Sequence, residues 1–280
     1  MNVAVGLARL GHDVTLLTRL GDDPYGELVS DHVTSSGVAL APGSVVAGAR
    51  TSSALARLDD TGAATYEFDV TWELAATDLP PGLDCLHVGS IGTVLTPGAA
   101  QVRRLAAAAR AAGVVVSYDP NVRTSFVTDR AAYRTEVEEW AAGADVVKAS
   151  SDDVDFLTGE TVGEAEVRWA APFVVVTHGG EGISVATRRS WQVLPAVPVE
   201  VEDTIGAGDS FMSGLLDGLA RHSVLAHEAL RRVSEEVVED VVRSAAHAAA
   251  ITCGRAGADP PTRAELDAAQ QALGSDAPRG

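Results

Sequence analysis

The sequence predicts an α/β fold in which helices flank a doubly wound, mostly parallel sheet. Short Val-rich runs alternate with longer amphipathic stretches and the connections are short, which is the pattern of successive strand–helix units. Runs such as residues 113–119 and 172–179 are almost continuously apolar, as strands buried on both faces of a parallel sheet are. Hydrophobic residues make up 46% of the 280-residue chain, which is enough for a sizeable core.

The elements follow in order from a helical pattern over residues 2–11, with no strand before it. A strand at 13–18 leads to a helix over 24–37 that has Pro24 in its first turn, and a later helix ends on Gly113. The other expected strands are 83–89, 113–119, 144–150 and 172–179, and the other expected helices are 97–113, 130–142, 207–221, 234–252 and 262–273.

One segment departs from this alternation. Residues 51–72 read as two strands around an Asp-Asp-Thr-Gly turn, so we expect a hairpin inserted between strand–helix units. We expect one domain over residues 1–280, with residues 44–72 as a lid over a ligand. Tyr66 and Phe68 share one face of the hairpin, where they either cover a substrate or pack the hairpin itself.

Composition excludes several classes of partner. The 21 Lys and Arg against 39 Asp and Glu give a net charge of −18, which repels nucleic acid and anionic membranes. No apolar run approaches the roughly 20 residues of a membrane span, and no signal peptide is apparent, so we expect a cytoplasmic protein. The chain has two cysteines, Cys85 and Cys253, which we expect to be buried free thiols. His87, His178 and His247 are isolated in the sequence, and we assign them no chemistry.

Residues 201–220, VEDTIGAGDSFMSGLLDGLA, carry the strongest chemical signal. Small residues at the start of a helix let backbone amides approach an anion, and the helix adds its positive end. Asp209 beside such amides would accept a proton while Gly206, Ala207 and Gly208 stabilise a transferred phosphoryl group. Alternatively, Asp209 simply caps the helix.

The string DTIGAGDSF resembles the signature of the ribokinase-like (PfkB) sugar kinases. Other strings resemble further motifs of that family, in the same order along the chain: 19–26, 146–159, 174–185 and 249–266. The resemblance covers nearly the whole chain. It implies a ribokinase-like fold and an ATP-dependent kinase that acts on a small sugar, with Mg²⁺ and, in some members, K⁺.

The resemblance also implies roles for single residues. Asp209 would be the catalytic base and the amides of Gly206, Ala207 and Gly208 the anion hole. Lys148 would contact phosphate, although a strand-end lysine that reaches solvent remains the alternative. The remaining implied residues bind nucleotide (Ser150, Thr177, Gly179, Gly182), place Mg²⁺ through water (Asp153) or hold a monovalent cation (Asp203 and the Ile205 carbonyl). Ser150 and Asp153 stand where the family's K-x-N-x-x-E motif has Asn and Glu. Fructokinase-like members often have Ser in place of that Asn.

The string SYDPNVRTSF lies at the carboxyl end of a predicted parallel strand, where open α/β sheets bind ligands. Asn121 and Arg123 would then face the crevice, unless Arg123 is only a solvated turn residue. The string resembles D-x-N-x-R of fructokinases and 2-keto-3-deoxygluconate kinases. Fructose is therefore the expected acceptor, with 2-keto-3-deoxygluconate kinase or ribokinase activity as alternatives.

The amino end differs from the family. Members usually begin with a strand that carries a sugar-binding Asp and a G-G-x-x-x-N turn, of which only Asn2, a substrate-binding position, is matched here. We expect that the sequence begins inside a longer protein. A nucleotide- or sugar-binding protein with impaired catalysis is the alternative from a different class. The resemblance also implies a homodimer through the lid strands.

Overall fold

The computed structural model describes residues 1–58, 64–158, 169 and 171–275. Its centre is a six-stranded sheet in the order β12-β11-β10-β9-β8-β7. Neighbours among β7 to β10 run parallel, whereas β11 and β12 pair antiparallel. The strands are β7 (Cys85–Gly89), β8 (Val115–Asp119), β9 (Val146–Ser150), β10 (Phe173–Thr177), β11 (Ile183–Thr187) and β12 (Trp191–Leu194). The predicted doubly wound, mostly parallel sheet is confirmed.

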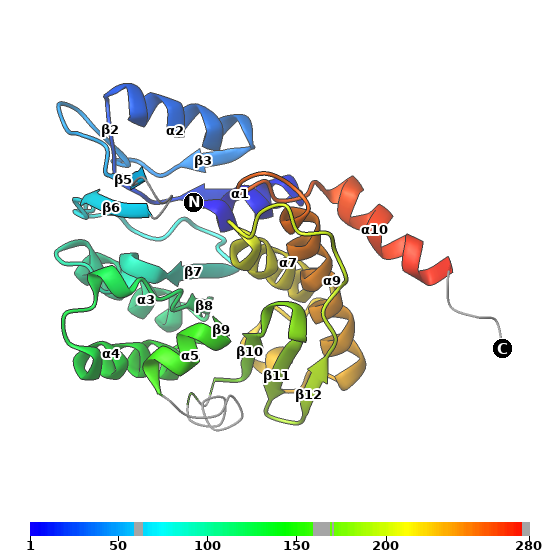
Figure 1. Ribbon diagram of the computed structural model, residues 1–280. Helices are drawn as coiled ribbons and strands as arrows, with labels where there is room; N and C mark the ends of the chain where they lie inside the picture. The colour runs from blue at the N-terminus through cyan, green and yellow to red at the C-terminus, as the bar shows by residue number, and fades with distance from the viewer. Residues whose placement is uncertain (59–63, 159–168, 170, 276–280) are drawn as a thin grey trace.

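Helices cover both faces of this sheet (Figure 1). One face packs on α3 (Gly98–Ala111), α4 (Arg130–Ala142) and α5 (Ser151–Leu157). The other face packs on α1 (Asn2–Arg9), α7 (Ala207–Arg221) and α9 (Glu235–Cys253). Alternate residues of each central strand enter the two cores: Val116 and Tyr118 of β8 join the first, and Val115 joins the second. Every residue of β8 is therefore buried.

The position of α1 depends on a close approach to α7. A side chain on Gly6 would bring its Cβ to 2.8 Å from the Cβ of Ser213, so only glycine permits this packing. The approach brings the start of α1, and with it Asn2, to the amino end of α7. The remaining helices are the short α8 (His227–Leu230) and α10 (Arg263–Ser275). Helix α10 projects from the body of the molecule (Figure 1).

Three two-stranded sheets lie beside the central one, on the side where Figure 1 shows α2 (Pro24–Ser35). Two of them are parallel and the third is the expected hairpin of antiparallel strands. They pair β1 (Val14–Leu16) with β3 (Val38–Leu40), β2 (Leu20–Gly21) with β4 (Val45–Val46), and β5 (Ser53–Leu58) with β6 (Ala64–Asp69). The Asp-Asp-Thr-Gly turn of the hairpin lies outside the described residues.

The five strands and seven helices expected from periodicity are all present, with ends that shift by a few residues. The short strands β2, β3 and β4, the antiparallel β11 and β12, and the short helices α5 and α8 were not expected. A strand of two or three residues, and a helix of seven, is too short to show a periodic pattern of its own. Tertiary pairing decides such elements.

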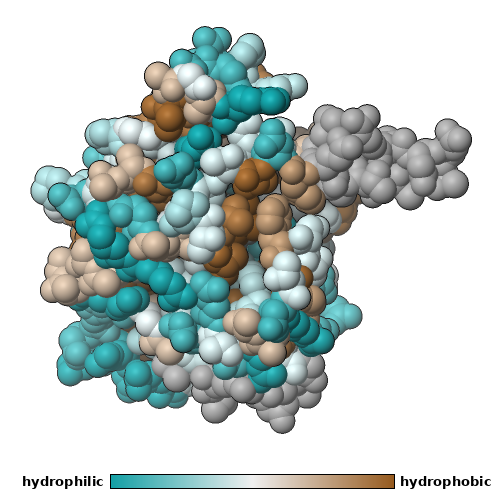
Figure 2. Space-filling view, turned by 90° about the vertical axis from the view of Figure 1, so that its left-hand side faces the viewer, coloured by the Kyte–Doolittle hydropathy of each residue, from teal (hydrophilic) through white to brown (hydrophobic). Residues whose placement is uncertain are grey.

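The surface has both apolar and acidic regions. Figure 2 shows a band of hydrophobic residues in the middle of one face, with hydrophilic residues on both sides. Large apolar side chains that stay exposed include Val199, Val201 and Ile205, which precede α7. Within the described ranges, none of the helices combines the length and the apolar character that a membrane crossing requires. The thiols of Cys85 and Cys253 are free, as expected, but half-buried rather than fully buried.

Candidate active site

The first turn of α7 has the geometry of an anion site. Gly206 is the N-cap residue and adopts a left-handed φ of 79°, which favours glycine. The Ala207 amide donates to the Thr204 carbonyl at 3.2 Å, and the Ser210 amide donates to the Gly206 carbonyl at 2.8 Å. The amides of Gly208 and Asp209 lie between them, in the turn where helix amides have no acceptor inside the helix. These two amides, with the positive end of α7, can therefore bind an anion.

Asp209 lies within this turn and does not act as the helix cap. It is the third residue of α7, and the N-cap position belongs to Gly206, which has no side chain. Its Oδ2 accepts a hydrogen bond of 2.8 Å from Nδ2 of Asn2, which α1 brings to this point. The simple capping alternative is thus wrong, and Asn2 and Asp209 meet although they are 207 residues apart in the chain.

A buried ion pair lies beneath the same turn. Nζ of Lys148 is 3.1 Å from Oδ2 of Asp119, and each side chain is 4% exposed. The alternative in which Lys148 reaches solvent is therefore wrong. Burial raises the pKa of Asp119 to about 6 even though the ammonium opposes that rise. A Cβ on Gly208 would lie 2.9 Å from Nζ of Lys148, so this ammonium sits directly against the start of α7.

The loop after β8 folds back on itself. The Asn121 amide donates to Oδ1 of Asp119 at 3.1 Å, and Asn121 adopts a left-handed φ of 35°. Nη1 of Arg123 donates to Oδ1 of Asn121 at 2.6 Å, while the guanidinium remains exposed. The structure thus brings Asn121 and Arg123 together at the carboxyl end of β8, where the sequence predicted a ligand-binding loop.

Ser150 and Asp153 form a reciprocal cap on α5. The Ser150 hydroxyl accepts the Asp153 amide at 3.1 Å, and Oδ2 of Asp153 accepts the Ser150 amide at 2.9 Å. Oδ1 of Asp153 accepts the Val122 amide at 2.7 Å, which fastens the loop after β8 to α5. A Ser-x-x-Asp sequence signals such a cap, and that signal would have revealed α5.

The predicted nucleotide residues follow the ends of adjacent strands. Thr177 ends β10 and pairs in register with Ser150 at the end of β9. Gly179 and Gly182 flank the turn between β10 and β11, with left-handed φ values of 55° and 121°. A Cβ on Gly182 would lie 2.5 Å from the carbonyl oxygen of Leu194, so this glycine also serves the packing of β12.

The predicted cation residues lie just before α7. The carboxylate of Asp203 accepts the Ile205 amide at 3.0 Å and the Gly257 amide at 2.9 Å. These backbone hydrogen bonds lower the pKa of Asp203 and join the segment before α7 to the loop after α9. In the part of the chain that the structure describes, no three His, Cys, Asp or Glu side chains gather where they could hold a metal ion.

The hairpin of β5 and β6 contacts the loop after β8 through two aromatic rings. Phe68 of β6 and Phe126 contact each other edge to face, with ring centroids 5.0 Å apart and planes at 61°. Phe126 lies three residues after Arg123, so the hairpin touches the segment that carries Asn121 and Arg123. Phe126 was not predicted from the sequence, since a single aromatic residue in a loop carries no periodic signal. The side chain of Tyr66 lies outside the described residues.

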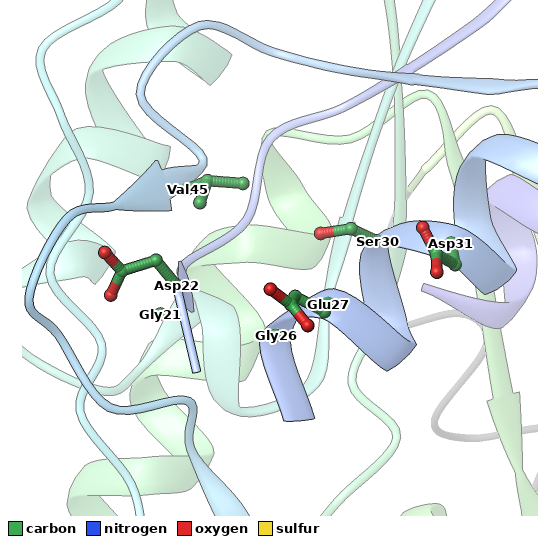
Figure 3. Close-up of a pocket in the computed structure, with 7 residues that line it drawn as sticks. All are labelled: Gly21, Asp22, Gly26, Glu27, Ser30, Asp31 and Val45. Carbon is green, nitrogen blue, oxygen red and sulfur yellow. The ribbon is translucent and has the colours of Figure 1, made fainter. Parts of the chain in front are cut away.

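A separate depression lies away from α7. Figure 3 shows this pocket, of about 370 Å³, between α2, β2 and β4. Its lining includes the carboxylates of Asp22, Glu27 and Asp31. Three negative charges disfavour a phosphate-bearing ligand. The first turn of α7 is therefore the better candidate for anion chemistry.

Known proteins resemble this chain in sequence and in fold. The sequence pattern of the pfkB family of carbohydrate kinases matches residues 1–265. A fructokinase of Klebsiella pneumoniae is 35% identical over 234 residues, which are 80% of this chain and 76% of that protein. A fructokinase of Escherichia coli is 32% identical over 244 residues, 83% of this chain and 80% of that protein. The Vibrio cholerae O395 fructokinase structure with bound fructose, ADP and calcium has a TM-score of 0.81 at 30% identity, covering 95% of this chain and 88% of that one.

Proposed function

This chain belongs to the pfkB family of carbohydrate kinases, and we propose that it uses ATP to phosphorylate a hydroxyl of fructose. It is a phosphotransferase of the sugar kinase class, as its family and its fructokinase relatives indicate. The observation that carries the proposal is the first turn of α7, where the Asp209 carboxylate lies beside helix amides and close to the Lys148 ammonium. The choice of fructose follows the relatives, one of which binds fructose and ADP.

Asp209 is the base in this proposal. A carboxylate beside an anion site repels its ligand, unless it takes up a proton from the attacking hydroxyl. The hydrogen bond from Asn2 orients the carboxylate through Oδ2, and Oδ1 receives the proton. The hydroxyl oxygen then forms its bond to the γ-phosphorus as the bond to the ADP oxygen breaks.

The anion hole is formed by the turn from Gly206 to Asp209, with backbone amides stabilising the transferred group. Lys148 adds a fixed positive charge from below, and we assign Arg123 the same role from the loop after β8. When bound, Mg²⁺ offsets negative charge on the phosphates. Asp153 would act on that ion through water, because Mg²⁺ bound to phosphates usually keeps several of its waters.

The remaining assignments belong to the same proposal. Ser150, Thr177, Gly179 and Gly182 lie along the nucleotide at the ends of β9 and β10, and Asp203 and the Ile205 carbonyl hold K⁺. Asn121 and Phe68 face the sugar in a single domain whose lid is residues 44–72. The lid contact at Phe126 supports this arrangement, because it joins the hairpin to the loop that carries Asn121. A homodimer through the lid strands and a cytoplasmic location also remain proposals.

Release of ADP from Mg-ATP tests the function. Fructose, 2-keto-3-deoxygluconate, ribose, glucose and adenosine are compared as acceptors, with and without K⁺. We expect the fastest turnover with fructose. Faster turnover with another sugar would keep the kinase and change its acceptor. ATP binding without turnover on any acceptor would instead favour a binding protein with impaired catalysis.

A further inference from the structure

The ion pair between Asp119 and Lys148 joins two neighbouring strands of the central sheet. The register of β8 and β9 pairs Tyr118 with Val147, so the next residues, Asp119 and Lys148, stand at the same level. Both point to the face that α7 covers, because side chains alternate along a strand and Val146 of β9 packs in the core beneath α7. At 3.1 Å and with both side chains 4% exposed, the pair is shielded from water.

The position of the Lys148 ammonium is unusual for a cation. It lies against the start of α7, 2.9 Å from where a Gly208 Cβ would stand, and the positive end of a helix repels cations. Burial, the largest single effect, would lower the pKa of Lys148, but the negative charges of Asp119, Asp153 and Asp209 together outweigh it and the pKa is raised. Asp119, which is hydrogen-bonded to Nζ at 3.1 Å, thus helps to keep a charged ammonium at a place that favours an anion.

Asp119 has a second contact through its other oxygen. Oδ1 accepts the Asn121 amide at 3.1 Å and so helps to turn the loop toward Asn121 and Arg123. One carboxylate therefore connects the ammonium below α7 with the loop after β8. Substitutions of Asp119 that keep or remove the acceptor oxygen can separate these two effects.

We propose that Asp119 is a positioning residue for phosphoryl transfer: it fixes the Lys148 ammonium beside the first turn of α7, where that charge joins the backbone amides in stabilising the transferred phosphoryl group. The inference rests on the proposed kinase function. Asp119 acts through Lys148 and does not itself touch the substrate. The effect of Asp119 on kcat therefore disappears when Lys148 is replaced.

A double-mutant cycle tests this dependence. Asp119→Asn removes the negative charge but keeps an oxygen that can accept the Asn121 amide. We expect kcat to fall about 100-fold, the size of effect seen when one donor to a developing negative charge is lost. The KM for the sugar should stay within about threefold, because the loop remains turned. In a Lys148→Met background, Asp119→Asn should change kcat by less than about twofold.

Asp119→Ala and Asp145→Asn complete the design. Asp119→Ala also removes the loop acceptor, so the KM for the sugar should rise as well. Asp145 is a matched control at the opposite end of the sheet, buried and hydrogen-bonded to the Val116 amide at 3.0 Å and to His227 at 2.7 Å. Both Asn variants should lower Tm, but only Asp119→Asn should lower kcat.

Three results would overturn the inference: an unchanged kcat in Asp119→Asn, equal losses of kcat in the two Asn variants, or an undiminished effect of Asp119→Asn without Lys148. If circular dichroism shows that Asp119→Asn does not fold, Gly208→Ala replaces it. That change displaces Nζ of Lys148 without altering charge, and an unchanged kcat would again refute the inference. Wild-type turnover is measured first, since its absence on every sugar refutes the proposed function and the inference together, whereas unaffected variants refute the inference alone.

Discussion

Gly206→Ala gives a quantitative test of the anion turn. The left-handed φ of 79° at this position costs an alanine roughly 1 to 2 kcal/mol. The new Cβ would lie 2.6 Å from the Cβ of Ala258, and such overpacking costs about 1 to 3 kcal/mol. Alanine also lowers the conformational entropy of the unfolded chain, which offsets about 0.4 to 1 kcal/mol of this loss in the free energy of unfolding. The free energy of unfolding should therefore fall by about 1 to 5 kcal/mol.

Equilibrium unfolding in urea measures this loss, with Gly113→Ala as the matched control. Gly113 follows α3 at a similar φ of 77°, and among the described residues nothing lies within 4 Å of its added Cβ. The control should therefore lose only about 1 kcal/mol. The difference between the two variants is the contact with Ala258. The kcat should fall only in Gly206→Ala, because that change displaces the amides of the first turn of α7.

Equal losses of stability in the two variants would refute the close approach of Ala258 to Gly206. An unchanged kcat in Gly206→Ala would refute the role of this turn as the anion hole. The two measurements are independent, so each part of the reasoning fails separately.

Three further predictions concern the proposed base, the hairpin contact and the half-buried His87. Asp209→Asn should lower kcat by about 10² to 10⁴, the usual range for loss of a general base, with ATP affinity by calorimetry unchanged. Phe126→Leu removes an edge-to-face contact worth about 0.5 to 1.5 kcal/mol, so steady-state kinetics should show a KM for the sugar raised by up to about tenfold. Burial lowers the pKa of His87 to about 4 from an unfolded value of 6.5, so the unfolded chain binds more protons between these pH values. Unfolding in urea should therefore show that the wild type loses more stability than His87→Gln as the pH falls from 6.5 to 4.

Each of these predictions has its own control or contrary result. Retained turnover in Asp209→Asn would remove that residue as the base. Phe156→Leu changes a ring that packs beneath Arg130, away from the lid, and should leave KM unchanged; a similar rise in KM would deny the lid contact any special role. Identical pH dependence in the wild type and His87→Gln would mean that the imidazole is not kept neutral by burial.

Local patterns in the sequence predict the architecture and the turn to which we assign the chemistry. Continuous valine runs such as those of β8 and β10 predict buried parallel strands, because only both-sided burial favours so many apolar residues in succession. The DTIGAGDSF string predicts the anion turn at the start of α7. Such a turn depends only on small residues followed directly by a helix, and both features can be seen in neighbouring residues of the sequence. The hairpin of β5 and β6 was likewise visible in its alternation and turn residues.

Only the tertiary structure decided which of these residues meet. Asp119 and Lys148 are 29 residues apart in the chain, and their pairing depends on the register of β8 with β9. Phe126 acquires its contact only because the hairpin of β5 and β6 packs its Phe68 against it. Asn2 reaches Asp209 only because α1 packs closely on α7 at Gly6. Strand register and helix packing arise from the whole core at once, and no local stretch of sequence contains that information.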